Sequence, residues 1–116
     1  MNKRPSLRLI PSLREKKRYL AFEVISQKPV ASALVSSTVN QAFVSLHGEL
    51  GAASAGIHIP AALVQNKRGI IRVNHASLDL ARASLCMVQR IGAEPCVVRS
   101  VGASGSLKKA KRYLAA

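Results

Sequence analysis

The chain has 116 residues, which favours one domain, and 48% of them are apolar, which is enough for a packed core. Lysine and arginine total 18 against 5 acidic residues, so the net charge is +13 at neutral pH. A small domain with this imbalance repels itself, and a polyanionic partner is the natural explanation. Nucleic acid fits better than an anionic membrane, because no apolar run approaches the roughly 18 residues that a membrane span needs.

The first stretch is basic and contains prolines, so we expect residues 1–13 to be a flexible arm and residues 14–116 to be a single domain. For the arm, RNA contact and a tail without function both remain open. Pro5 and Pro11 interrupt the arm and no apolar segment follows, which argues against a secretory signal. Residues 17–26 then alternate between two faces, as a strand with one face on the core does. The side chains expected to face the core are Leu20, Phe22 and Val24.

Helical spacing of apolar residues predicts a helix at residues 31–50 with a broad buried stripe. Residues 53–66 are expected to form an edge strand, because Pro60 has no N–H to donate to a neighbouring strand. A turn at residues 66–69 leads into another strand at residues 70–74. These two strands are expected to pair as a hairpin.

A second helix is predicted at residues 76–91, and Gly92 is expected to follow its end. A strand at residues 95–101 comes next, and a glycine-containing loop joins it to a short basic helix at residues 107–114. The order βαββαβ predicts an α+β, ferredoxin-like fold of the kind found in RNA-recognition domains. Its antiparallel sheet carries helices on one face, with the basic helix added at the C-terminus. The fold hosts many functions and selects none of them.

The third expected strand is similar to the strand on which RNA-recognition domains stack bases, but it lacks the stacking aromatic side chains. Ile70 and Arg72 stand at the two aromatic positions. The tyrosines and phenylalanines of the whole chain are Tyr19, Phe22, Phe43 and Tyr113. Reading of single-stranded bases is therefore not expected. Recognition of RNA shape and backbone by lysine and arginine is favoured.

Alternation along the strands also places three charged residues on the open face of the sheet. In a ferredoxin-like fold the first strand lies between the third and the fourth, so Glu23, Arg72 and Arg99 would meet. An ordinary cross-strand ion pair is one explanation of this grouping. The other is a charge-patterned face that binds a protein partner, and we favour this second explanation.

The loop before the terminal helix contains Gly102 and Gly105, which allow backbone N–H groups to converge on a phosphate. A plain turn with Ser104 or Ser106 as the helix cap explains the same residues, so both interpretations remain open. Four basic residues within five positions are a stronger sign of RNA contact. The candidate RNA contacts are Arg14, Lys16, Lys17, Arg18, Lys67, Arg68, Ser104, Lys108, Lys109, Lys111 and Arg112.

No catalytic or metal-binding constellation is expected. The three histidines are scattered, and the five acidic residues show no pairing suited to acid–base catalysis. An acylphosphatase-like enzyme would share the fold, but the glycine-rich, arginine-containing loop of that family is replaced by Ser-Gln-Lys-Pro at residues 26–29. Cys86 and Cys96 form no CxxC pair and are expected to be buried thiols in a reducing compartment.

Three segments resemble the ribonuclease P protein component 2 family of archaea and eukaryotes. They are KRYLAFE at residues 17–23, GIIRVNH at residues 69–75 and VRSVGASGSLKKAK at residues 98–111. The last of them is the most specific. Their order and spacing agree with that family over about residues 14–114.

This resemblance implies a non-catalytic protein subunit of the endonuclease particle that removes the 5′ leader from precursor tRNA. The particle's RNA, with bound Mg²⁺, would perform the hydrolysis, and the protein itself would bind no cofactor. The implied partners are ribonuclease P RNA, precursor tRNA indirectly, and ribonuclease P protein component 3, with self-association and without a membrane. A cytoplasmic location is expected. The alternatives are a ribosomal or other structural RNA-binding protein and, more remotely, the acylphosphatase-like enzyme.

Overall fold

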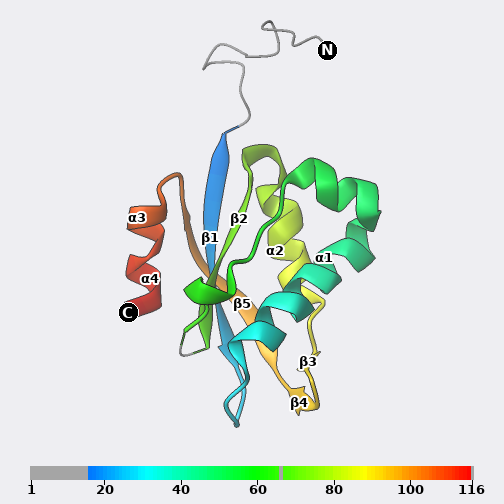
Figure 1. Ribbon diagram of the computed structural model, residues 1–116, viewed down its shortest axis with the longest axis vertical. Coiled ribbons are helices and arrows are strands. Elements are labelled where there is room, and N and C mark those ends of the chain that lie inside the picture. Colours follow the sequence, from blue (N-terminus) through cyan, green and yellow to red (C-terminus); the bar gives the residue numbers. More distant parts are fainter. Residues whose placement is uncertain (1–15, 66, 116) are drawn as a thin grey trace, which may run out of the picture.

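The structure is a computed structural model that describes residues 16–65 and 67–115. At its centre is a three-stranded antiparallel sheet in the order β2-β1-β5 (Figure 1). These strands are β1 (Lys17–Ile25), β2 (Arg68–Asn74) and β5 (Val97–Ser104). The first strand therefore lies in the middle, as the ferredoxin-like order predicts, and the expected α+β fold is confirmed. The predicted arm at residues 1–13 lies outside the described residues.

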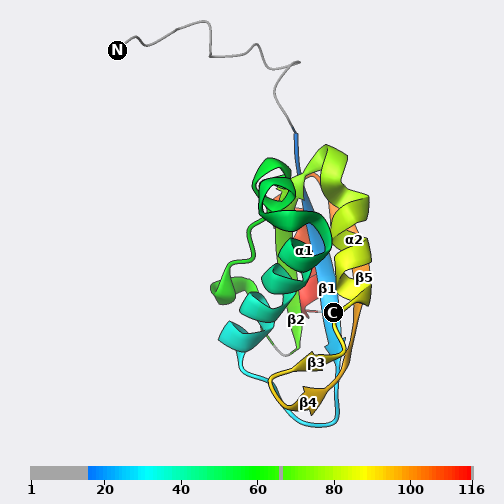
Figure 2. The same ribbon diagram turned by 90° about the vertical axis from the view of Figure 1, so that its right-hand side faces the viewer.

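Helices cover both faces of this sheet. α1 (Ser32–Ala55) and α2 (Leu78–Cys86) pack on one face, as Figures 1 and 2 show from two directions. The short α3 (Leu107–Ala110) and α4 (Arg112–Ala115) lie on the opposite face (Figure 1). The central strand is therefore enclosed between two layers of helix.

The predicted alternation of β1 is confirmed on the face toward α1 and α2. There Leu20 and Phe22 are fully buried and Val24 is nearly so. Ala21 points to the other face and is buried as well, because the terminal helices cover it. The helical side of the core is built from side chains three or four residues apart, as an amphipathic helix requires. These are Val35, Val39 and Phe43 of α1 and Ala81 and Leu85 of α2.

α1 extends to Ala55, five residues beyond the predicted end at residue 50. The chain leaves helical geometry at Gly48, where φ is 80° and ψ is 167°, and then resumes the helix. Burial of Ala52 and Ala55 against the core supports this resumed turn. The helix ends at Gly56, which adopts a left-handed φ of 62° and donates its N–H to the carbonyl of Ala53.

The predicted edge strand at residues 53–66 is largely wrong. Residues 53–55 belong to α1, and residues 58–65 lie beside β2, where they pair through isolated bridges, His58 to Arg72 and Gln65 to Arg68. Residue 66 lies outside the described residues. Between them lies a 3₁₀ turn, Ala61–Leu63. A continuous ladder is prevented because Pro60 lacks an N–H.

Hydrogen bonds to α1 hold this segment in place instead of a ladder. The hydroxyl of Ser36 donates to the carbonyl of Ile59 at 2.5 Å, and that of Ser32 donates to the carbonyl of Val64 at 3.0 Å. Two buried side chains, Ile59 and Val64, add apolar contact with the core. The segment is therefore fixed by the helix as much as by the sheet.

The second half of the chain differs from the prediction in its boundaries. α2 ends at Cys86, and Arg90 and Ile91, which were expected to belong to it, form β3 (Arg90–Ile91). This short strand pairs with β4 (Glu94–Pro95) in a small hairpin. Gly92 turns this hairpin with a φ of 65° instead of ending a helix. The predicted basic helix is present as two short turns, α3 and α4, on either side of Lys111.

We predict that Gly69→Ala destabilises the fold. Gly69 lies opposite Phe22 in the β1–β2 register, and an added Cβ would lie 2.5 Å from Cζ of the Phe22 ring. Because the ring is fully buried, it has no room to retreat, and the cost should be about 1–3 kcal/mol. Denaturant unfolding measures it. The same substitution made in a Phe22→Leu background should cost less, and an equal cost in both backgrounds would contradict this explanation.

Candidate nucleic-acid interface

The basic terminal helix begins at a serine cap. The hydroxyl of Ser106 accepts the N–H of Lys109 at 3.4 Å, and the hydroxyl of Ser104 accepts the N–H of Ser106 at 3.1 Å. Two of the amide groups that a phosphate would use are thus satisfied within the chain. The geometry supports the interpretation of this loop as a turn and cap.

An aromatic side chain fastens the terminal helices to the sheet. The Tyr113 ring lies against Gly102, where an added Cβ would be 2.5 Å from Cζ of the ring. Gly102 pairs with Ala21, and Ala21 pairs with Ile70, so the three form one row across the sheet. Ala21 and Ile70 are both buried, and Ala110 of α3 is fully buried as well. The centre of this sheet face is therefore closed to stacking bases.

A charged group on the same face of the sheet also attaches the terminal helices. Glu23 accepts hydrogen bonds from Arg99 Nε at 2.9 Å and from Arg68 Nη2 at 3.3 Å. The other terminal nitrogen of Arg68, Nη1, donates to the main-chain carbonyl of Tyr113 at 2.7 Å. Arg68 thus joins the sheet to α4 through the carbonyl of Tyr113.

The predicted grouping of Glu23, Arg72 and Arg99 is therefore wrong for one of its three residues. Glu23 meets Arg99 as expected, but Arg68 takes the place predicted for Arg72. In the β1–β2 register Glu23 lies opposite Arg68, whereas Arg72 lies opposite Tyr19. The two arginines are four residues apart on one face of β2, so alternation alone does not distinguish them. The role of this group in binding a protein partner stays a prediction.

The pKa of Glu23 lies below its ordinary value of 4.5. The hydrogen bond from Arg99 is the main cause, and the positive charges of Arg99 and Arg68 lower it further against the opposing effect of desolvation. The folded state therefore favours the ionised carboxylate. The contribution of this group to stability is present at neutral pH and is lost as the pH falls through the lowered pKa.

The predicted RNA contacts lie at both ends of β1 and on the terminal helices, which run between these ends. Near the start of β1 lie Arg18, whose guanidinium approaches Gly105, and Lys17, which donates to the side chain of Asn74. At the far end, Lys67 donates to the carbonyl of Ser26 at 2.7 Å, close to Arg68. Lys16, Ser104, Lys108 and Lys109 lie toward the start of β1, and Lys111 and Arg112 follow toward Tyr113, whose carbonyl bonds Arg68. Arg14 lies outside the described residues.

Basic side chains gather at the start of β1 and along the terminal helices. Lys108, Lys109, Lys111 and Arg112 are exposed, and within residues 16–65 and 67–115 none of them takes part in an ion pair. Arg72 and Ser104 both pair with Tyr19, which places Arg72 near the start of β1 too. The anchoring role of Tyr113 was not recognised in the sequence. The apolar spacing of Leu107, Ala110 and Leu114 in an otherwise basic helix was the signal for a docked face.

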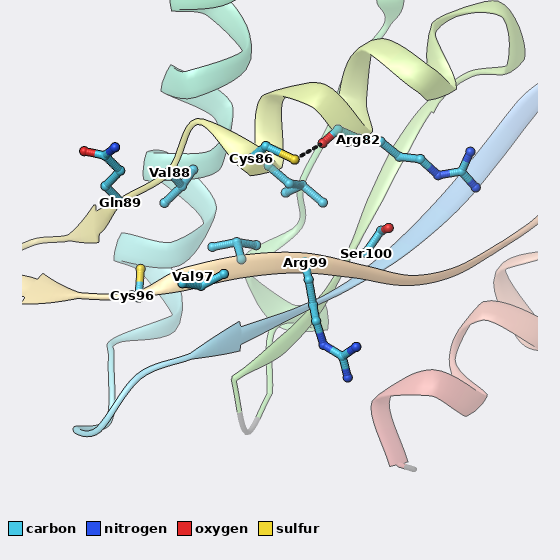
Figure 3. A pocket seen from close by; sticks show the side chains of 10 residues that line it. Arg82, Cys86, Val88, Gln89, Cys96, Val97, Arg99 and Ser100 are labelled. Atoms are coloured by element: carbon cyan, nitrogen blue, oxygen red, sulfur yellow. Dashed lines mark hydrogen bonds between the residues drawn. The ribbon is translucent and has the colours of Figure 1, made fainter.

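A groove between α2 and the outer edge of β5 is the other hollow of interest (Figure 3). It has a volume of about 530 Å³, and its walls include Leu85, Val88 and Val98.

Both cysteines of the chain also line this groove. Cys86 is exposed, which corrects the prediction that it is buried. Cys96 is buried as predicted, and burial raises the pKa of its thiol. In the described part of the chain, no cluster of three histidine, cysteine or acidic side chains could hold a metal ion.

None of the helices described is long and apolar enough to cross a bilayer. A ferredoxin-like sheet with a docked basic helix and a large excess of cations defines a class, the small α+β proteins that bind polyanions. The chain belongs to the Rpp14/Pop5 family, whose sequence pattern matches residues 18–115. The resemblance to component 2 read from the sequence is confirmed.

The individual relatives agree with this assignment. The chain is 37% identical over 103 residues to ribonuclease P protein component 2 of Methanosarcina mazei, covering 89% of this chain and 87% of the relative. It is 35% identical over 104 residues to the component 2 protein of Archaeoglobus fulgidus, covering 90% and 93%. A chain in the cryo-EM structure of yeast ribonuclease MRP superposes with a TM-score of 0.59 at 19% identity, covering 88% of both chains. That likeness shows a shared fold.

We predict that the contribution of Glu23 to the free energy of unfolding is lost at low pH. Above pH 5 or so, wild type should be more stable than Glu23→Gln by a constant amount, because the carboxylate is ionised in both the folded and the unfolded state. The difference should shrink below the ordinary pKa of 4.5 and vanish below the lowered folded pKa. Urea unfolding at a series of pH values tests this. A difference that does not change down to pH 2 would contradict it.

Proposed function

We propose that this chain is a protein subunit of ribonuclease P that binds and stabilises the RNA of that particle. The observation that carries the proposal is the match to component 2 proteins over about nine-tenths of the chain. The exposed basic helix supports it, because a strip of unpaired lysine and arginine suits the phosphates of a folded RNA. The covered sheet face agrees with recognition of RNA shape instead of single bases.

In this proposal the protein contributes charge neutralisation. Each lysine or arginine placed against a phosphate releases a condensed counterion, which favours compact RNA at lower salt. Mg²⁺ bound by the RNA would perform the hydrolysis of precursor tRNA, and this chain would contact that substrate indirectly. Component 3 is the proposed protein partner, and the pair would bind the catalytic domain of the RNA and self-associate.

Cleavage of precursor tRNA by ribonuclease P RNA at low Mg²⁺ tests the assignment. The RNA is assayed alone, with this protein, with component 3, and with both proteins. Activity that requires both proteins supports the proposal. If the pair neither binds that RNA nor helps its activity, the assignment fails, and a different structural RNA becomes the partner to seek.

We predict that Lys108→Ala with Lys109→Ala lowers the affinity for the RNA and flattens its dependence on salt. Loss of two phosphate contacts should reduce the slope of log affinity against log salt by about one to two units. Filter binding across a salt series measures this. Lys28→Ala with Arg90→Ala is the matched control, since both residues are exposed. Arg90 begins β3, and the N–H of Lys28 bonds Glu94 of β4, so both lie at the hairpin, which Figure 1 shows away from α3. Equal slopes for the two double variants would contradict the prediction.

A further inference from the structure

Glu23 is an acidic side chain placed among the elements that carry the basic surface. We propose that Glu23 is a positioning residue for RNA binding: through Arg68 it holds the terminal helices on the sheet and so sets where their lysines point. The RNA-binding part of this inference rests on the function proposed above. The attachment itself is a property of the chain and can be measured without RNA.

Arg68 is the link between the acid and the helices. Its guanidinium has a fork of N–H donors, and the two arms have different acceptors: Nη2 bonds Glu23 at 3.3 Å, and Nη1 bonds the carbonyl of Tyr113 at 2.7 Å. The Arg68 side chain is only 22% exposed. Both arms are thus engaged within the protein, and Arg68 acts on RNA through the helix that it holds and not as a direct phosphate contact.

Glu23 keeps the Arg68 guanidinium aligned because Arg99 holds the Glu23 carboxylate on its other side. Arg99 bonds Oε1 of the carboxylate, while Arg68 bonds Oε2. The carboxylate therefore bridges arginines from β2 and β5 across the central strand. Charge-assisted bonds of this kind are about twice as strong as neutral ones. The orientation of Arg68 consequently depends on the charge and on both oxygens of Glu23.

The terminal helices need this support because they are too short to be stable alone. α3 and α4 have four residues each, whereas isolated helices shorter than about 12 residues are marginal in water. They are attached to the sheet by the buried Ala110 of α3, by the Tyr113 ring over Gly102 and by the Arg68 bond to the Tyr113 carbonyl. Loss of the Arg68 bond would loosen the attachment of α4 and let Lys111 and Arg112, and to a smaller extent Lys108 and Lys109, change direction.

Glu23→Gln separates positioning from simple charge. The substitution makes the protein more positive, so if charge alone governs RNA binding, the affinity should rise. If Glu23 positions the helices, the affinity should fall by about threefold to tenfold, because glutamine offers one acceptor oxygen and no charge to two arginines. Glu49→Gln is the matched control: Glu49 is exposed on α1, across the sheet from the terminal helices (Figure 1). Its affinity should stay equal or rise slightly.

Arg68→Lys tests the link without changing the net charge. A lysine is a single point donor and does not span the carboxylate and the carbonyl as the guanidinium fork does. The RNA affinity should therefore fall as it does in Glu23→Gln. Thermal unfolding of each variant confirms that the sheet remains folded at the assay temperature.

Amide hydrogen exchange supplies the readout that does not need RNA. In Glu23→Gln and Arg68→Lys, the amides of Ala110, Lys111 and Leu114 should exchange faster than in wild type, while those of His58 and Arg72 should be unchanged. Faster exchange of these helix amides together with weaker RNA binding supports the proposal. Unchanged helix exchange, or RNA binding that is tighter in Glu23→Gln, overturns it. If the wild type fails to bind ribonuclease P RNA, the proposed function falls, and the exchange measurement still decides whether Glu23 holds the helices.

Discussion

The central strand β1 has helices on both of its faces, and most of the structure follows from that position. Leu20 and Phe22 are buried against α1 and α2, while Ala21 between them is buried under the terminal helices. A strand enclosed in this way cannot shift by one residue without moving a phenylalanine onto the face made for an alanine. The register with β2 and β5 is fixed accordingly, and with it the position of every charged side chain on the sheet.

Two glycines make this enclosure possible. Gly69 leaves room for the Phe22 ring on the core face, and Gly102 leaves room for the Tyr113 ring on the opposite face. In both places a close approach between ring and backbone replaces a side-chain contact, because interiors are packed too densely to hold an extra methyl group. Phe22 and Tyr113, which pack against these glycines, are half of the tyrosine and phenylalanine residues in the chain. The scarcity of aromatics that argues against base stacking thus coincides with a structural use for Phe22 and Tyr113.

The positions of the basic side chains depend on how the terminal helices are attached to the sheet, which the net charge alone does not describe. Four exposed cations follow one another on two short helical turns, and those turns are attached to the sheet by a ring contact and by Arg68. A rigid strip of charge is more useful to an RNA-binding protein than a mobile one, because ordering the strip on binding would cost conformational entropy. The acidic Glu23 beneath these cations is therefore compatible with binding a polyanion when it keeps the terminal helices rigid.

The sequence by itself determined the fold class, the central place of β1, its core face and the basic character of the C-terminus, because these follow from local alternation, helical spacing and composition. It did not determine that residues 58–65 form bridges and a 3₁₀ turn, or that Arg68 takes the place expected for Arg72. Arg68 and Arg72 lie on the same face of one strand, and only pairing with β1 decides which of them meets Glu23. The attachment of Tyr113 over Gly102 was likewise decided by the tertiary structure. Those two residues are eleven positions apart and become neighbours only when the terminal helices fold back onto the sheet. The apolar spacing of the terminal helix indicates that it packs on something, but it does not say which part of the sheet the helix meets.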